Sequence, residues 1–111
     1  MPMLRGTLDP LVLKTVSWSP MHAFEISNWI EEQSDGHVQV DDAALLQALH
    51  RLEERRHIAG EWGVTENGRR AKYYSLTAAG RDYLRTEAAE LVDHLGAIVS
   101  ILSAKPSKSR G

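Results

Sequence analysis

The sequence contains no cysteine, so it can form no disulfide and offers no thiolate ligand to a metal. No apolar run approaches the length that is needed to span a membrane. The N-terminal stretch also lacks the long apolar core of a secretory signal peptide. We therefore expect a cytoplasmic protein without a membrane partner.

Features of enzymes and metal sites are missing as well. The five histidines are scattered, and no two of them have the spacing that places two ligands on one helix face. There is no nucleophile motif and no glycine-rich phosphate loop between a strand and a helix. Asp41 and Asp42 resemble paired carboxylates, but a helix N-terminus explains them better. The sequence predicts no enzyme, no cofactor and no metal.

The charges are nearly balanced over the whole chain but unevenly distributed along it. The net charge of −2 argues against nonspecific attraction to nucleic acid. Residues 1–49 carry two basic and seven acidic side chains, whereas residues 50–72 carry six basic and four acidic ones. A basic segment in the middle of the chain is therefore the candidate for contact with an anionic partner.

Apolar side chains at helical spacing predict three helices in the first half of this chain, whose 111 residues suit one domain. The first helix ends where Ser19 precedes a proline, because that position disfavours the helical conformation. A short alternation of apolar and polar residues after the second helix predicts a strand. The expected ranges are 7–17, 22–33 and 42–56 for the helices and 37–40 for the strand.

The third helix has two distinct faces. Asp41 or Asp42 is expected to cap it, as Thr7 caps the first helix. One face should pack in the core, and it is formed by Leu45, Ala48, Leu49 and Leu52. The opposite face carries groups that can hydrogen-bond to base edges, and it is formed by Ala43, Leu46, Gln47, His50, Arg51 and Glu54. Such a face can also be plain solvated surface, with Arg51 or Arg55 paired to Glu54.

A β-hairpin is expected next. Residues 58–64 and 71–76 have strand character, and Asn67-Gly68 between them tolerates the positive φ of a tight turn. Exposed cations lie at or just beyond the tip, where phosphate is a natural partner; they are Arg69, Arg70 and Lys72. The hairpin should be anchored on the core by Trp62 and by one of Tyr73 and Tyr74.

Thr77 is expected to cap a long last helix over residues 78–102. Apolar residues in this helix follow the heptad spacing of a coiled coil, and they are Leu84, Ala88, Leu91, Leu95, Ile98 and Leu102. This seam can pack within one subunit, but a long terminal helix with its own seam is more typical of a dimer interface. The small, basic residues 104–111 predict a disordered tail.

Together these elements predict a mainly α protein with a small β-ribbon, namely a winged helix-turn-helix followed by a C-terminal dimerisation helix. The expected organisation is a DNA-binding domain over residues 1–77, a dimerisation helix over 78–103 and the tail over 104–111.

Three blocks of the sequence resemble the PadR family of transcriptional regulators. They read LRGTLDPLVLKTVSWSPMHAFEI at 4–26, ALHRLEERRHIAGEW at 48–62 and NGRRAKYYSLTAAG at 67–80. The blocks stand in the family's order and spacing, and the resemblance covers roughly residues 4–90. The length and the one C-terminal helix match the short subfamily.

The resemblance implies a homodimeric repressor that binds a pseudo-palindromic operator in double-stranded DNA. The third helix would enter the major groove, the hairpin would touch the backbone or minor groove, and the C-terminal helices would pair the subunits. Many members release DNA when they bind a small molecule, often an aromatic one. The candidates for DNA contact are Leu46, Gln47, His50, Arg51, Asn67, Arg69, Arg70 and Lys72. The candidates for an effector pocket, which otherwise suit the core, are Trp18, Phe24 and Trp29.

The chain departs from the family pattern in two places. Ala23-Phe24 replace the usual Gly-Tyr pair, and Leu46-Gln47 stand where the third helix of the family usually has Tyr-Pro. The family tyrosine faces DNA and can reach a phosphate, whereas Leu46 cannot make that hydrogen bond. An alternative function is therefore a winged-helix module for protein–protein contact, with the acidic first half as its working face, or an effector sensor that does not bind DNA.

Overall fold

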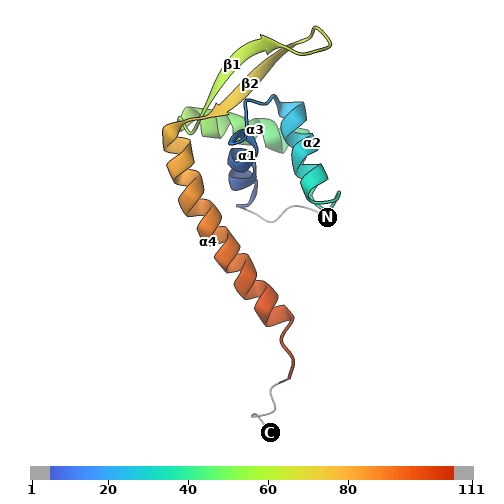
Figure 1. Ribbon diagram of the computed structural model, residues 1–111, viewed down its shortest axis with the longest axis vertical. Coiled ribbons are helices and arrows are strands. Elements are labelled where there is room, and N and C mark those ends of the chain that lie inside the picture. Colours follow the sequence, from blue (N-terminus) through green and yellow to red (C-terminus); the bar gives the residue numbers. More distant parts are fainter. Residues whose placement is uncertain (1–5, 107–111) are drawn as a thin grey trace.

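The structure, a computed structural model, describes residues 6–106. Three short helices form a compact body, a hairpin projects from one end of it, and a long last helix runs away from it (Figure 1). The molecule measures 67 × 28 × 21 Å, because much of the last helix extends beyond the body. In chain order the elements are α1 (Leu8–Val16), α2 (Ala23–Gln33), α3 (Asp42–Glu54), β1 (Ile58–Val64), β2 (Arg70–Leu76) and α4 (Ala78–Leu102).

Helix α1 is the centre of the core, and it packs against α2, α3, α4 and β2. Val12 and Leu13 are fully buried, and so is Thr15, whose hydroxyl donates to the carbonyl of Leu11 at 2.7 Å. That bond satisfies a polar group that would otherwise be costly to bury. The predicted inner face of α3 is confirmed, because its four residues are at most 2% exposed; they are Leu45, Ala48, Leu49 and Leu52.

The predicted caps of α3 and α4 are confirmed. The Asp41 carboxylate accepts from the backbone N–H of Ala44 at 3.0 Å, and the Thr77 hydroxyl accepts from that of Gly80 at 3.0 Å. Helix α2 begins with a reciprocal pair, in which the His22 ring accepts from the N–H of Glu25 and the Glu25 carboxylate accepts from the N–H of His22. Helices α2, α3 and α4 therefore start where a side chain satisfies one of the first free N–H groups. The predicted cap of α1 is wrong, because the Thr7 side chain makes no capping hydrogen bond to that helix.

The hairpin is antiparallel, with Ile58 opposite Leu76 and Val64 opposite Arg70. Gly68 adopts a φ of 79° in the turn, so of the Asn-Gly pair only the glycine uses the positive φ that both residues tolerate. Tyr74 holds the hairpin to the body, since it is 9% exposed and its backbone exchanges two hydrogen bonds with Met21 at 2.9 and 3.1 Å. The expectation that a tyrosine anchors the hairpin is thus confirmed.

Two expectations about the body and hairpin are wrong. Residues 37–40 form no strand, because no strand lies beside them to complete a ladder, and the N–H of Val38 bonds instead to the Ser34 hydroxyl at 2.9 Å. Trp62 does not anchor the hairpin, because its ring is 59% exposed on the part of the strand that extends beyond the body.

The expected burial of the other large aromatics is wrong for two of three. Trp18 at the end of α1 is 64% exposed and Phe24 in the first turn of α2 is 71% exposed. Only Trp29 packs against the core. Helical periodicity places a residue on a face of its own helix, but the neighbouring elements decide whether that face is covered.

Helix α4 is fixed to the body at its N-terminus. The Thr77 hydroxyl donates to the carbonyl of Arg56 at 2.7 Å, and its N–H donates to that of His57 at 3.1 Å. Gly80 passes so close to His57 that a Cβ there would overlap the His57 carbonyl oxygen. The His57 ring stacks on Tyr83 at 4.4 Å between centroids, and burial raises the pKa of Tyr83.

Within residues 6–106, no helix is long and apolar enough to cross a membrane. The C-terminal part of the predicted disordered tail, residues 107–111, lies outside the described residues.

Candidate nucleic-acid interface

A cleft of about 770 Å³ lies between the hairpin, the start of α2 and the exposed side of α3. Five of the predicted DNA-contact residues line it, and they are Leu46, Asn67, Arg69, Arg70 and Lys72. The other described residues that line it are His22, Ala23, Phe24, Trp62, Thr65, Ala71 and Tyr74. None of these twelve side chains is a carboxylate, although the chain as a whole carries a net charge of −2. The cleft is therefore a local basic surface on a slightly acidic protein.

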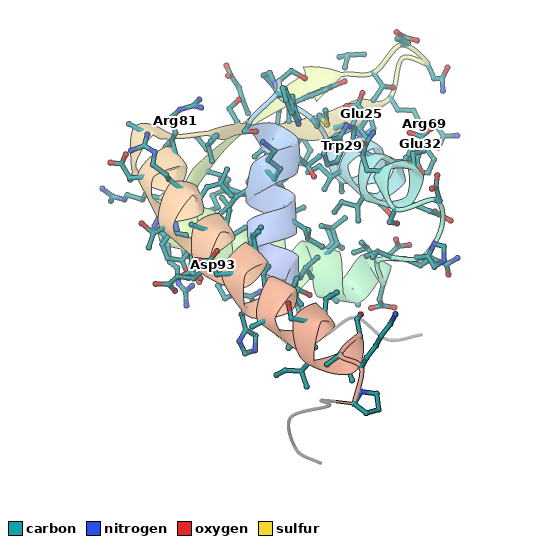
Figure 2. All side chains as sticks on the ribbon, turned by 60° about the horizontal axis from the view of Figure 1, so that its bottom comes forward. Glu25, Trp29, Glu32, Arg69, Arg81 and Asp93 are labelled. Carbon is teal, nitrogen blue, oxygen red and sulfur yellow. The ribbon has the colours of Figure 1, made fainter. Side chains whose placement is uncertain are left out.

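The hairpin tip is ordered by its own hydrogen bonds. The Thr65 hydroxyl accepts from the N–H of Arg69 at 3.1 Å, and the backbone N–H of Thr65 donates to the Arg69 carbonyl at 2.7 Å. Arg69 projects from the hairpin into solvent (Figure 2). The Arg70 guanidinium lies 4.6 Å from the centroid of the Trp62 ring, a cation–π contact that leaves Arg70 exposed while restricting its freedom. Trp62 thus positions a cation of the hairpin.

Lys72 differs from the two arginines because its charge already has a partner. Its Nζ donates to Glu53 Oε1 at 2.9 Å and lies 5.7 Å from the Tyr74 ring. The hydrogen bond to Glu53 raises the pKa of Lys72. This pair links β2 to α3, so Lys72 is better suited to holding the hairpin against the helix than to binding a phosphate.

The outer face of α3 presents Gln47 and His50 to solvent. His50 Nε2 lies 3.7 Å from Glu54 Oε1, and both side chains are well exposed. An exposed pair of this kind contributes little to stability, so it can break when another partner is offered.

Arg51 does not extend freely from this face. Its Nε donates to Asp9 Oδ2 at 3.0 Å and its Nη2 donates to Asp9 Oδ1, which makes a bidentate pair between α3 and α1. The hydrogen bond to Asp9 raises the pKa of Arg51. The expected local pairing of Arg51 with Glu54 is wrong, because Glu54 faces His50 instead. No local pattern could reveal a partner 42 residues away.

The three aromatics predicted for an effector pocket are not brought together in any of the described pockets. Phe24 lines the cleft beside the hairpin, which no sequence signal had indicated. The Trp18 ring is covered on one side by Lys14, whose Nζ lies 4.8 Å from its centroid. Trp29 packs on the core. Phe24 is therefore a candidate for the surface shared by α3 and the hairpin and not for an effector pocket with Trp18 and Trp29.

A second groove, of about 610 Å³, runs between α1 and α4. Leu84 belongs to the core of its own chain and Ala88 packs against it, so these two residues of the predicted dimer seam are already used internally. Leu91, Leu95 and Ile98 are half-buried. Four large apolar residues of α4 are strongly exposed, and they are Val92, Val99, Ile101 and Leu102. Leu102 belongs to the predicted seam and is the most exposed of the four, so the free apolar side of α4 combines the C-terminal end of that seam with Val92 and Val99.

The family model of the PadR-like transcriptional regulators matches residues 12–86. The chain belongs to the PadR-like transcriptional regulator family. This membership confirms the predicted family, the winged helix-turn-helix fold and a role in the regulation of transcription. In a winged helix-turn-helix fold, the third helix and the hairpin are the parts that are expected to contact DNA. The cleft lies between these two elements, so it is the candidate DNA-binding surface.

Several known proteins are similar to the chain over most of its length. An uncharacterised protein X of Lysinibacillus sphaericus is 29% identical over 96 residues, which cover 81% of this chain and 88% of that protein. A transcriptional regulator from Clostridium thermocellum is 27% identical, with a TM-score of 0.75 over 91% of this chain and 93% of that one. A Streptococcus mutans protein is 23% identical, with a TM-score of 0.80 over 96% of both chains, and this likeness shows the fold alone.

Proposed function

We propose that this PadR-like regulator binds double-stranded DNA as a homodimer and represses transcription from a pseudo-palindromic operator. Helix α3 lies in the major groove and the hairpin tip follows the adjacent phosphates. The observation that carries this proposal is the cleft, where Leu46 of α3 and the arginines of the hairpin line one surface without a carboxylate. A double-stranded polyanion with readable base edges suits such a surface.

Six of the eight candidate residues divide into three groups. Arg69 and Arg70 are exposed and without a carboxylate partner among the described contacts, so they suit phosphate contacts that position the protein. Gln47 and His50 suit hydrogen bonds to base edges, because they stand exposed on the outer face of α3. Arg51 and Lys72 are paired to carboxylates, so their role is to hold α3 and the hairpin in place; their partners are Asp9 and Glu53.

Helix α4 supports the homodimer. Its exposed apolar side chains need cover, because contiguous exposed apolar surface is unusual in a monomer. Arg81 and Arg85 lie in the same half of α4 as Asp82 and Glu87. Arg85 is already paired, with its Nη1 3.7 Å from Asp82 Oδ1, so charge does not decide how two copies of α4 pack. A two-fold dimer of this kind presents two α3 helices to successive major grooves, about 34 Å apart.

Release from DNA by a small aromatic effector is the regulatory part of the proposal. Trp18 exposes a ring at the end of α1, and its neighbour Lys14 lines the groove between α1 and α4. A flat apolar molecule that stacks on Trp18 would lie beside α4 and could alter the spacing of the two α3 helices. Quenching of tryptophan fluorescence by the effector, lost in Trp18→Phe, would support this placement.

The test of DNA binding uses fluorescence anisotropy with the DNA upstream of the protein's own coding region, over a range of salt concentrations. Arg69→Ala with Arg70→Ala should weaken binding and lower the salt slope by roughly one to two units, because each lost phosphate contact releases one counterion fewer. Lys72→Ala is the matched control on the same hairpin, and its slope should stay near that of the parent protein because Glu53 already neutralises this charge.

Two results would contradict the proposal. An unchanged salt slope in the double variant would remove the hairpin from the interface. No binding to the upstream DNA at low salt would refute DNA binding there and would favour the protein–protein module instead.

A further inference from the structure

Two large apolar side chains face solvent in the cleft that also carries the hairpin arginines. Phe24 is 71% exposed and Leu46 is 57% exposed, and both line the cleft with Arg69 and Arg70. They come from different helices, so the fold and not the local sequence brings them together. An apolar group in this position gains nothing from water and cannot hydrogen-bond to a base or phosphate.

We infer that Phe24 and Leu46 read the 5-methyl groups of thymines in the operator. This inference rests on the proposed DNA binding and names the chemistry by which part of the sequence is selected. Thymine is the one common DNA base that presents a methyl group in the major groove, and apolar side chains recognise it by contact.

The surroundings of the two residues favour DNA as the occupant of this cleft. An apolar floor beside two cations matches the major groove, which offers methyl groups next to a row of phosphates. Among the residues that the structure describes, no carboxylate lines the cleft to repel those phosphates. Charge and apolar character are thus both complementary to the same partner.

The two side chains are also well placed on their helices. Leu46 lies in the N-terminal half of α3, the part of a recognition helix that contacts base edges in this class of fold. Phe24 lies in the first turn of α2, next to the capping residue His22, whose ring stacks on Phe24 at 6.5 Å and meets Tyr73 edge-on at 5.3 Å. Both are therefore held on rigid elements, which a selective contact requires.

The test removes the methyl groups and nothing else from the DNA. A binding site is selected from random duplex with the parent protein, and the same duplex is then made with deoxyuridine in place of thymine. Loss of one buried methyl contact should weaken binding by about fourfold, so parent protein should bind the deoxyuridine duplex at least that much less tightly. Deoxyuridine confined to the flanks of the site should leave binding unchanged.

The protein side of the test uses Phe24→Ala and Leu46→Ala, which are safe for folding because both side chains are exposed. Each variant should show a smaller ratio of thymine to deoxyuridine affinity than the parent protein, and the double variant should show a ratio near one. Val64→Ala is the control, since it shortens an exposed apolar side chain that does not line the cleft and should keep the full ratio.

The outcomes separate this inference from the function on which it rests. Equal binding of the two duplexes by the parent protein, or an undiminished ratio in the double variant, overturns the reading of methyl groups while DNA binding stands. Failure to enrich and bind any duplex at low salt overturns the proposed function, and this inference with it.

Discussion

The same substitution at two glycines of α4 should change stability in opposite directions. Gly80→Ala places a Cβ against the carbonyl oxygen of His57 and within 2.9 Å of the Leu76 side chain. The oxygen cannot move away easily, because it also accepts from the N–H of Thr77 at 3.1 Å. At Gly96, by contrast, a Cβ meets no heavy atom within 4 Å.

The magnitudes follow from three terms. Overpacking at Gly80 costs about 2 kcal/mol, and moving α4 to relieve it weakens the Thr77 cap, which is worth about 1 kcal/mol. Alanine favours the helix by about 1 kcal/mol. Gly80→Ala should therefore lower the free energy of unfolding by about 2 kcal/mol and the Tm by about 8 °C. Gly96→Ala keeps only the favourable term and should raise the Tm by about 4 °C.

Thermal unfolding followed by circular dichroism is the assay, at one protein concentration for all variants because a dimer's Tm depends on concentration. A Gly80→Ala protein as stable as the parent would show that α4 does not pack so closely on the α3–β1 turn. A lower Tm in Gly96→Ala would show that a second chain covers Gly96.

Three further predictions concern the links between elements. Asp9→Ala should lower the free energy of unfolding by about 1 kcal/mol, because it removes the partly exposed bidentate partner of Arg51; an unchanged midpoint in urea would show that the pair contributes nothing. Thr77→Val should lower the free energy of unfolding by about 1–2 kcal/mol and speed hydrogen exchange at the Gly80 amide, because the Thr77 hydroxyl is hydrogen-bonded to two backbone groups. Thr77→Ser keeps the hydroxyl and should be as stable as the parent protein. Val92→Glu with Val99→Glu should give a folded monomer that binds operator poorly, with Ala97→Glu as an exposed control on the opposite face of α4; sedimentation as a dimer would place the subunit interface elsewhere.

The elements themselves could be predicted closely from the sequence. Each helix begins or ends within a residue or two of its expected bounds, and β1 has its expected bounds. Such signals are local, since a cap, a proline or an Asn-Gly turn acts within a few residues of itself. The short strand over residues 37–40 failed because a strand depends on a neighbour that its own sequence does not supply.

Which side chains of these elements are buried, exposed or paired was harder to predict from the sequence. The inner face of α3 was predicted correctly, and it is buried because α1, α2 and β1 pack against this helix. Trp62 and Phe24 were expected in or on the core but are exposed, because both line the open cleft beside the hairpin. Arg51 and Lys72 were candidates for DNA contact, and their pairing with Asp9 and Glu53 was not predicted, because these carboxylates lie on other elements.

The sequence by itself determined the order of the helices, the position of the turn and the family of this protein, since these depend on short-range chemistry and on residue patterns. Tertiary structure alone decided which cations are tied to carboxylates, as Arg51 and Lys72 are. It also decided that Phe24 and Leu46, 22 positions apart, line one cleft with Arg69 and Arg70. The physical reason is that burial, pairing and exposure are set by what lies nearby in space, which a local pattern does not contain.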